Sequence, residues 1–195
     1  IIDSGSIPGI NHYIESGPGF AFQVDTRNSI FFPTQGFCLT GKSSFQHKAF
    51  GSDYNFGRHE YDIRYFFGIS GDHVMAFQFR FKMAHGEVPL ESLSGIGGDD
   101  LMRGYIENRY LDKSSLAAQA EYRFPLVWRF AGTIFAGAGE VQPSLKRYNP
   151  SDLHPAAGAG LRLIIDRNEH ITARVDFGWN DTGSMSIYFL VKEAF

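Results

Sequence analysis

The segment 36–43 reads GFCLTGKS and matches the glycine-rich loop that binds phosphates in many nucleotide-hydrolysing proteins. Such a loop works only between a strand and a helix, because its backbone amides and the helix terminus must face the phosphates. Here the residues alternate as in a strand, which predicts that Lys42 points inward and Gly41 outward. We therefore expect no nucleotide site at this position.

A serine and a histidine on the outward face of the same segment suggest ester hydrolysis as a second chemistry. Ser43 and His47 share that face, but four residues at the rise of a strand separate them by about 13 Å. That distance is too long for a nucleophile and its base. A partner from another strand would be required, and the sequence does not identify one.

The histidines and acidic residues do not show the spacing of a metal site. None of the 7 histidines pairs at ligand spacing with Cys38 or with another histidine. Asp99, Asp100 and Glu107 could bind a divalent cation between lipopolysaccharide phosphates, although such a cluster is more often a solvated loop. The sequence thus predicts no catalytic residue, no metal site and no cofactor.

Alternation of apolar and polar residues runs through most of the chain. It is clearest from Met75 to Met83, where one face carries Met and Phe and the other Ala, Gln, Arg and Lys. A helix would spread these aromatic rings around its circumference, so the pattern indicates strands. We predict nine strands and a weaker tenth at 7–15; the nine lie at about 18–27, 36–48, 58–69, 73–84, 114–125, 128–141, 155–166, 169–179 and 184–195.

The composition restricts the class of protein. The 195 residues include 19 Phe, 9 Tyr and 2 Trp, and a soluble protein that exposed so many rings on one sheet face would aggregate. No run of 18 apolar residues occurs, which argues against a transmembrane helix. The net charge of −3 argues against nucleic acid as a partner. Rings that face lipid from alternating strands fit all three observations.

The predicted connections alternate in length. Tight turns follow the strands that end near residues 69, 125 and 166, whereas 85–113 and 142–154 are long. This asymmetry is typical of outer-membrane barrels. Such barrels have an even number of strands, so the nine clear strands require the weaker strand at 7–15 as well, and we favour ten strands over eight. We predict an all-β fold: one transmembrane, antiparallel, up-and-down barrel over residues 1–195, with charges of both signs paired across its narrow interior.

Several segments resemble one family when they are taken in order along residues 18–195. These segments are 25–28, 32–36, 97–105 (GGDDLMRGY), 120–125 (AEYRFP), 135–139, 154–162, 174–178 (RVDFG) and the terminal Phe195. With them the chain resembles the C-terminal barrel of the BamA/TamA outer-membrane assembly factors, also called the bacterial surface antigen superfamily.

The resemblance implies that the loop with Arg103, Gly104 and Tyr105 folds back into the barrel lumen. In the family, an acidic residue on an inward-facing strand position holds this arginine. The usual aspartate aligns with Gly137, and Glu121 and Asp176 share the inward parity, so we expect Arg103 to pair with one of these two. A guanidinium in a confined lumen requires such a carboxylate, because its desolvation is otherwise uncompensated.

The last predicted strand resembles the signal by which barrel strands are recognised for insertion. Ile187, Phe189 and Val191 lie on the apolar parity and Phe195 ends the chain, although Glu193 interrupts the apolar row. A lipid-facing strand with a terminal aromatic residue would show the same pattern.

The resemblance implies residence in the bacterial outer membrane. Assembly factors of the family carry periplasmic POTRA domains before a larger barrel, and we expect this chain to lack them. We predict a non-enzymatic role in outer-membrane biogenesis or lipid organisation. The expected partners are outer-membrane lipids, further copies in a homo-oligomer and other outer-membrane proteins. A small pore or transporter and a lipid-modifying enzyme remain alternatives.

Overall fold

The computed structural model describes residues 12–166, 171–191 and 193–195. Nine long strands form one antiparallel sheet with the order β1-β2-β3-β4-β7-β8-β9-β10-β11. They are β1 (Gly19–Asp25), β2 (Gly36–Gln46), β3 (Phe56–Ser70), β4 (His73–Gly86), β7 (Ser114–Pro125), β8 (Phe130–Gln142), β9 (His154–Asp166), β10 (Ile171–Asn180) and β11 (Met185–Leu190). The nine predicted strands are thus confirmed; most ends shift by one or two residues, whereas the last strand ends at Leu190 instead of residue 195.

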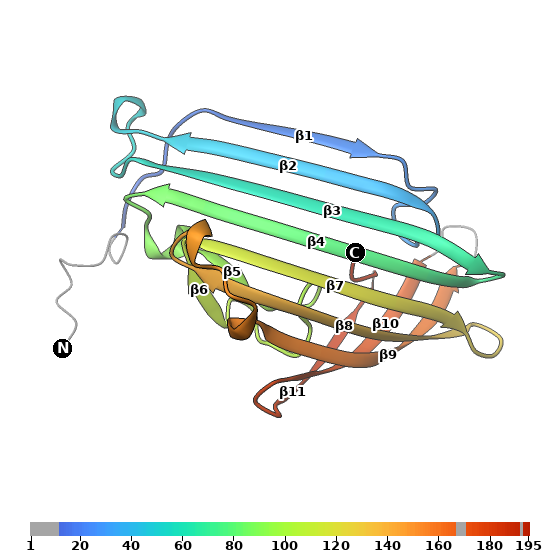
Figure 1. Ribbon diagram of the computed structural model, residues 1–195. Coiled ribbons are helices and arrows are strands. Elements are labelled where there is room, and N and C mark those ends of the chain that lie inside the picture. Colours follow the sequence, from blue (N-terminus) through green and yellow to red (C-terminus); the bar gives the residue numbers. More distant parts are fainter. Residues whose placement is uncertain (1–11, 167–170, 192) are drawn as a thin grey trace.

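The sheet curls without closing (Figure 1). Among the described residues, β1 pairs only with β2 and β11 pairs only with β10, so each leaves one edge open. We expected a closed barrel, and the structure differs at this point. Residues 12–15 form no strand, and the rest of the predicted strand at 7–15 lies outside the described residues. The expected partner of β1 on its free side is therefore not present in the described sheet.

The two faces of the sheet have opposite character. The outer face, which carries exposed aromatic and aliphatic side chains, includes Phe22, Ile63, Phe77, Leu161 and Phe189. The inner face buries many charged residues, and they include Asp62, Glu121, Arg123, Arg162, Arg174 and Asp176. This division follows the period of two along each strand. It fits lipid outside and paired charges inside.

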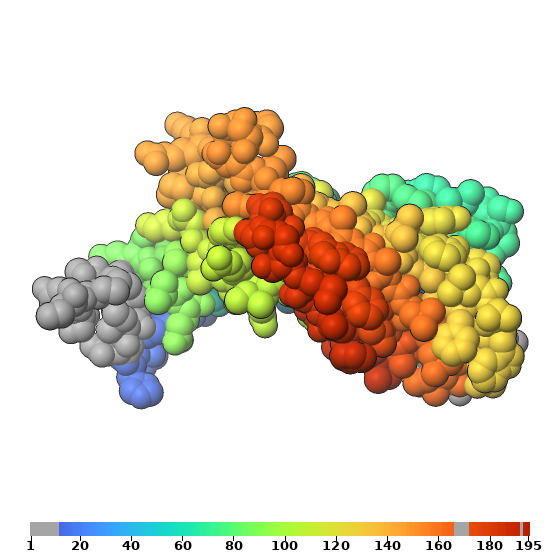
Figure 2. All heavy atoms as spheres, turned by 90° about the horizontal axis from the view of Figure 1, so that it is seen from below, coloured from blue at the N-terminus to red at the C-terminus, as the bar shows by residue number. Residues whose placement is uncertain are grey.

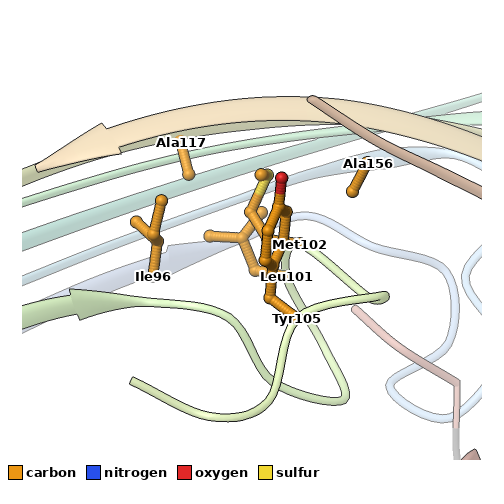
Figure 3. Close-up of a cluster of buried hydrophobic side chains, with 6 residues drawn as sticks. All are labelled: Ile96, Leu101, Met102, Tyr105, Ala117 and Ala156. Carbon is orange, nitrogen blue, oxygen red and sulfur yellow. The ribbon is translucent and has the colours of Figure 1, made fainter. Parts of the chain in front are cut away.

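The segment between β4 and β7 folds onto the inner face and holds a small sheet of its own, which is β5 (Ser94–Ile96) paired with β6 (Tyr110–Asp112). Its apolar side chains pack with two small residues of the wall, and the cluster consists of Ile96, Leu101, Met102, Tyr105, Ala117 and Ala156 (Figure 3). The short helices are 3-10 turns at Lys48–Phe50, Leu90–Ser92, Leu145–Arg147 and Pro150–Asp152. In the described ranges, no helix has the length and apolar character needed to cross a membrane.

Candidate functional site

Arg103 is the centre of the buried polar network on the inner face. Its side chain is fully buried, and Nη1 donates to Asp176 Oδ2 at 2.7 Å while Nη2 donates to Glu121 Oε2 at 2.5 Å. The guanidinium also lies 3.6 Å from the ring centroid of Phe135. The structure therefore brings Arg103 to both carboxylates that sequence parity selected, from β7 on one side and β10 on the other.

Three further arginines surround the same two carboxylates. Arg123 Nε donates to Glu121 Oε1 at 2.7 Å, Arg174 Nη1 donates to Asp176 Oδ2 at 2.7 Å, and Arg162 contacts Asp176 Oδ1. Each of these arginines is at most 1% exposed. Mixed charges are the only way to bury so many guanidinium groups, because an unpaired buried ion is strongly destabilising. The network ties the loop to β7, β9 and β10 at once.

Gly104 allows the loop backbone to lie directly on β10. Its φ is +122°, and a Cβ at this position would lie 2.8 Å from the carbonyl oxygen of Trp179. On the strand side, a Cβ on Gly178 would lie 2.6 Å from the carbonyl carbon of Arg103. Gly104 is therefore required for its backbone conformation and for space, and Gly178 for space alone.

Hydrogen bonds to β9, β10 and β11 fix Gly104 and Tyr105 in place. Tyr105 donates from its hydroxyl to the carbonyl of Pro155 at 2.8 Å, and Tyr188 donates to the carbonyl of Tyr105 at 2.9 Å. Asn180 Nδ2 donates to the carbonyl of Gly104 at 2.9 Å. Burial raises the pKa of Tyr105 to about 12, so its hydroxyl stays protonated and remains a donor. In Figure 2 the loop atoms, in yellow-green, lie beside the red atoms of β11.

Asp100 attaches the loop to the other half of the sheet. Its carboxylate accepts from Arg80 Nη2 at 2.8 Å. Burial acts to raise the pKa of Asp100, but the attraction of Arg80 outweighs it and the pKa is lowered. Asp99 contributes its carbonyl, which accepts from Arg174 at 2.7 Å. No group of three or more His, Cys, Asp or Glu residues able to hold a metal occurs within the described chain.

The C-terminal residues divide between the two faces. Ile187, Phe189 and Val191 are exposed on the outer face, as their parity requires. The strand ends at Leu190, however, and Phe195 is 4% exposed on the inner face, where its ring lies 6.0 Å from that of Phe66. The expectation of a strand that faces lipid to its last residue differs from the structure.

Glu193 supplies the physical reason for this difference. It is buried on the inner face, where it accepts from Arg162 Nε at 3.0 Å and from Thr172 Oγ1 at 3.1 Å. A carboxylate facing lipid would be uncompensated, so the chain turns inward to pair it. In the sequence, Glu193 interrupts the row of apolar residues Ile187, Phe189 and Val191, and this charge is the signal from which the inward turn could be predicted.

The structure pairs Ser43 with a histidine that sequence reasoning did not identify. Ser43 Oγ lies 2.9 Å from His59 Nδ1 on the neighbouring strand, and the His59 ring stacks on His85 at 5.4 Å. Among the described residues, no carboxylate hydrogen bonds to His59, and Ser43 lies within paired strands on both sides. The pair thus lacks both an orienting acid and the free backbone amides of an oxyanion hole.

The nucleotide-loop motif forms no phosphate-binding loop. Residues 36–46 form β2, which leads through a 3-10 turn into β3 without a following α-helix. Lys42 and Gly41 therefore lie on opposite faces of a strand, as predicted.

Comparisons with known proteins agree with this geometry. A family model described as the Omp85 superfamily domain matches residues 9–195. Among solved structures, the crystal structure of BamA from Haemophilus ducreyi lacking POTRA domains 1–3 is similar, with a TM-score of 0.72 and 13% sequence identity. The match covers 89% of this chain and 41% of that one, so the chain spans about two-fifths of its length. No curated protein matches the sequence. The expected family and the bacterial outer-membrane location are thereby confirmed: the chain belongs to the Omp85 superfamily.

Proposed function

We propose that the chain acts in outer-membrane biogenesis by offering the open edges of its sheet to strands of other chains. The supporting observation is that β1 and β11 each have one paired side among the described residues. In a bilayer, unpaired backbone N–H and C=O groups of an edge are costly, and they are a template for an added strand. The outer face provides the lipid-facing wall that keeps these edges in the membrane.

The direction of the strands restricts what can occupy the edges. All eight ladders of the main sheet are antiparallel, so β1 and β11 run in the same direction. A direct seam between them, within one copy or between two copies, would be parallel. An odd number of inserted strands keeps every ladder antiparallel, whether the strand comes from another polypeptide or from residues 1–11 of this chain.

A second part of the proposal concerns homo-oligomers. The outer face of β8 and β9 carries small residues beside larger ones such as Ile134 and Leu161; the small residues are Gly132, Ala136, Ala138, Ala157 and Ala159. Small residues let lipid-facing walls approach closely, which favours packing between copies. Association through this face leaves both edges free.

The experiment measures folding of a model outer-membrane barrel into vesicles with and without the protein. Acquisition of heat-modifiable mobility on a denaturing gel reports folding, and vesicles that hold a closed barrel of similar size are the control. We expect faster folding only with this protein. Equal rates in both vesicles would contradict the proposal, and steady ionic steps in a planar bilayer would favour the pore alternative.

A further inference from the structure

We infer that a cationic pocket on the inner face, distinct from the Arg103 network, binds a phosphate-bearing ligand. The pocket lies where β2, β3 and β4 meet the segment that follows β4, and its volume is about 400 Å³. Its polar lining includes Lys42, Ser44, Arg58, Glu60, Lys82 and Ser92. This volume is large enough for a phosphate group and part of the molecule that carries it.

The register of the strands places the charges of this pocket. Lys42 on β2 is opposite Glu60 on β3, and Glu60 is opposite Lys82 on β4, so the three side chains form a row across the sheet. Arg58 lies two residues before Glu60 on the same face. Three cations thus surround one carboxylate.

Among the described residues, neither Lys42 nor Lys82 forms an ion pair. The ion pairs near the pocket are formed by arginines instead. Glu60 lies 3.9 Å from Arg80, and Asp100 is held by the same arginine at 2.8 Å. Arg58 has only a loose contact with Glu15, at 3.8 Å. Glu60 is thus shared by Lys42 and Lys82 and has only a loose contact with Arg80, so positive charges outnumber negative ones along this row.

Ser92 holds Arg58 in place at the wall of the pocket. Its buried hydroxyl donates to Glu15 and accepts from Arg58 Nη1 at 3.3 Å. Ammonium and guanidinium groups that converge on one cavity are the donors that bind phosphate oxygens. Lys42 thus serves a phosphate site here from a strand, in a setting unrelated to a glycine-rich loop.

The test is equilibrium dialysis of the purified full chain in detergent against radiolabelled inorganic phosphate. The variant K42Q/K82Q removes both ammonium groups, and K48Q/K146Q removes two exposed lysines elsewhere with the same change of charge. We expect the first variant to bind phosphate about tenfold or more weakly, because two charge-assisted contacts are lost. The second variant should bind as the wild type does. Heat-modifiable mobility on gels checks that both variants fold.

Competition distinguishes the two sources of phosphate. Micelles that contain phosphatidic acid should displace the label if the ligand is a lipid headgroup, whereas micelles of phosphatidylcholine serve as the control. Displacement assigns the site to a headgroup, and retention of the label assigns it to a free phosphate. The inference is overturned if the wild type binds no phosphate, or if both double variants weaken binding equally.

Discussion

Replacing Arg103 with alanine tests the role of the buried network in holding the loop. The change removes a fully buried guanidinium that contacts Glu121 at 2.5 Å and Asp176 at 2.7 Å. Breaking a buried ion pair costs about 3–5 kcal/mol. Because Arg123 and Arg174 still contact these carboxylates at 2.7 Å, we expect the lower end of that range.

A loss of about 3 kcal/mol corresponds to about a 100-fold decrease in protection of the loop amides. Hydrogen exchange of residues 97–109 in detergent measures this directly, and the melting temperature should fall as well. Arg109→Ala is a matched control, since Arg109 is exposed in the same loop. We expect R103A to loosen the loop without producing ionic conductance. Unchanged loop protection in R103A would refute the reasoning.

Two other predictions concern Gly104, which follows Arg103 in the loop, and Asp181 in the turn between β10 and β11. Gly104→Ala should loosen the loop by about 1–3 kcal/mol, because φ is +122° and the new Cβ meets the carbonyl of Trp179. Gly183→Ala should have less effect in the same exchange measurement, because nothing lies within 4 Å of the Cβ that the alanine would add. Equal effects of the two substitutions would contradict the close approach of Gly104 to the Trp179 backbone. The hydrogen bond from His154 holds the pKa of Asp181 below its ordinary value of 3.8. The stabilisation that this hydrogen bond contributes should therefore be fully present above pH 3.8 and should be lost as the pH falls through the lower pKa of the folded state. The melting temperatures of wild type and D181N should then converge in acid. A difference that stays constant with pH would contradict the assignment.

The nine strands were predictable because each carries a period of two over many residues. The run from Met75 to Met83, for example, lies within β4 as observed. The short strands β5 and β6 were not predicted, because three residues are too few to show a period. Closure was not predictable either, since it depends on which strands meet at the edges rather than on any local pattern.

The arginine network was predictable only in part. Inward parity selects Glu121 and Asp176 as candidates, but parity gives the face of the sheet and not the distance across it. The structure shows that β10 and β7 approach the loop from two sides, so Arg103 reaches both carboxylates. The cross-strand contact between Ser43 and His59 was missed for the same reason, because it depends on the register of β2 and β3.

Native mass spectrometry of the protein extracted from its own outer membrane in mild detergent shows whether the outer wall and the open edges are the functional surfaces of this sheet. If they are, we expect an assembly of more than one chain that retains lipid. A lipid-free monomer would contradict it.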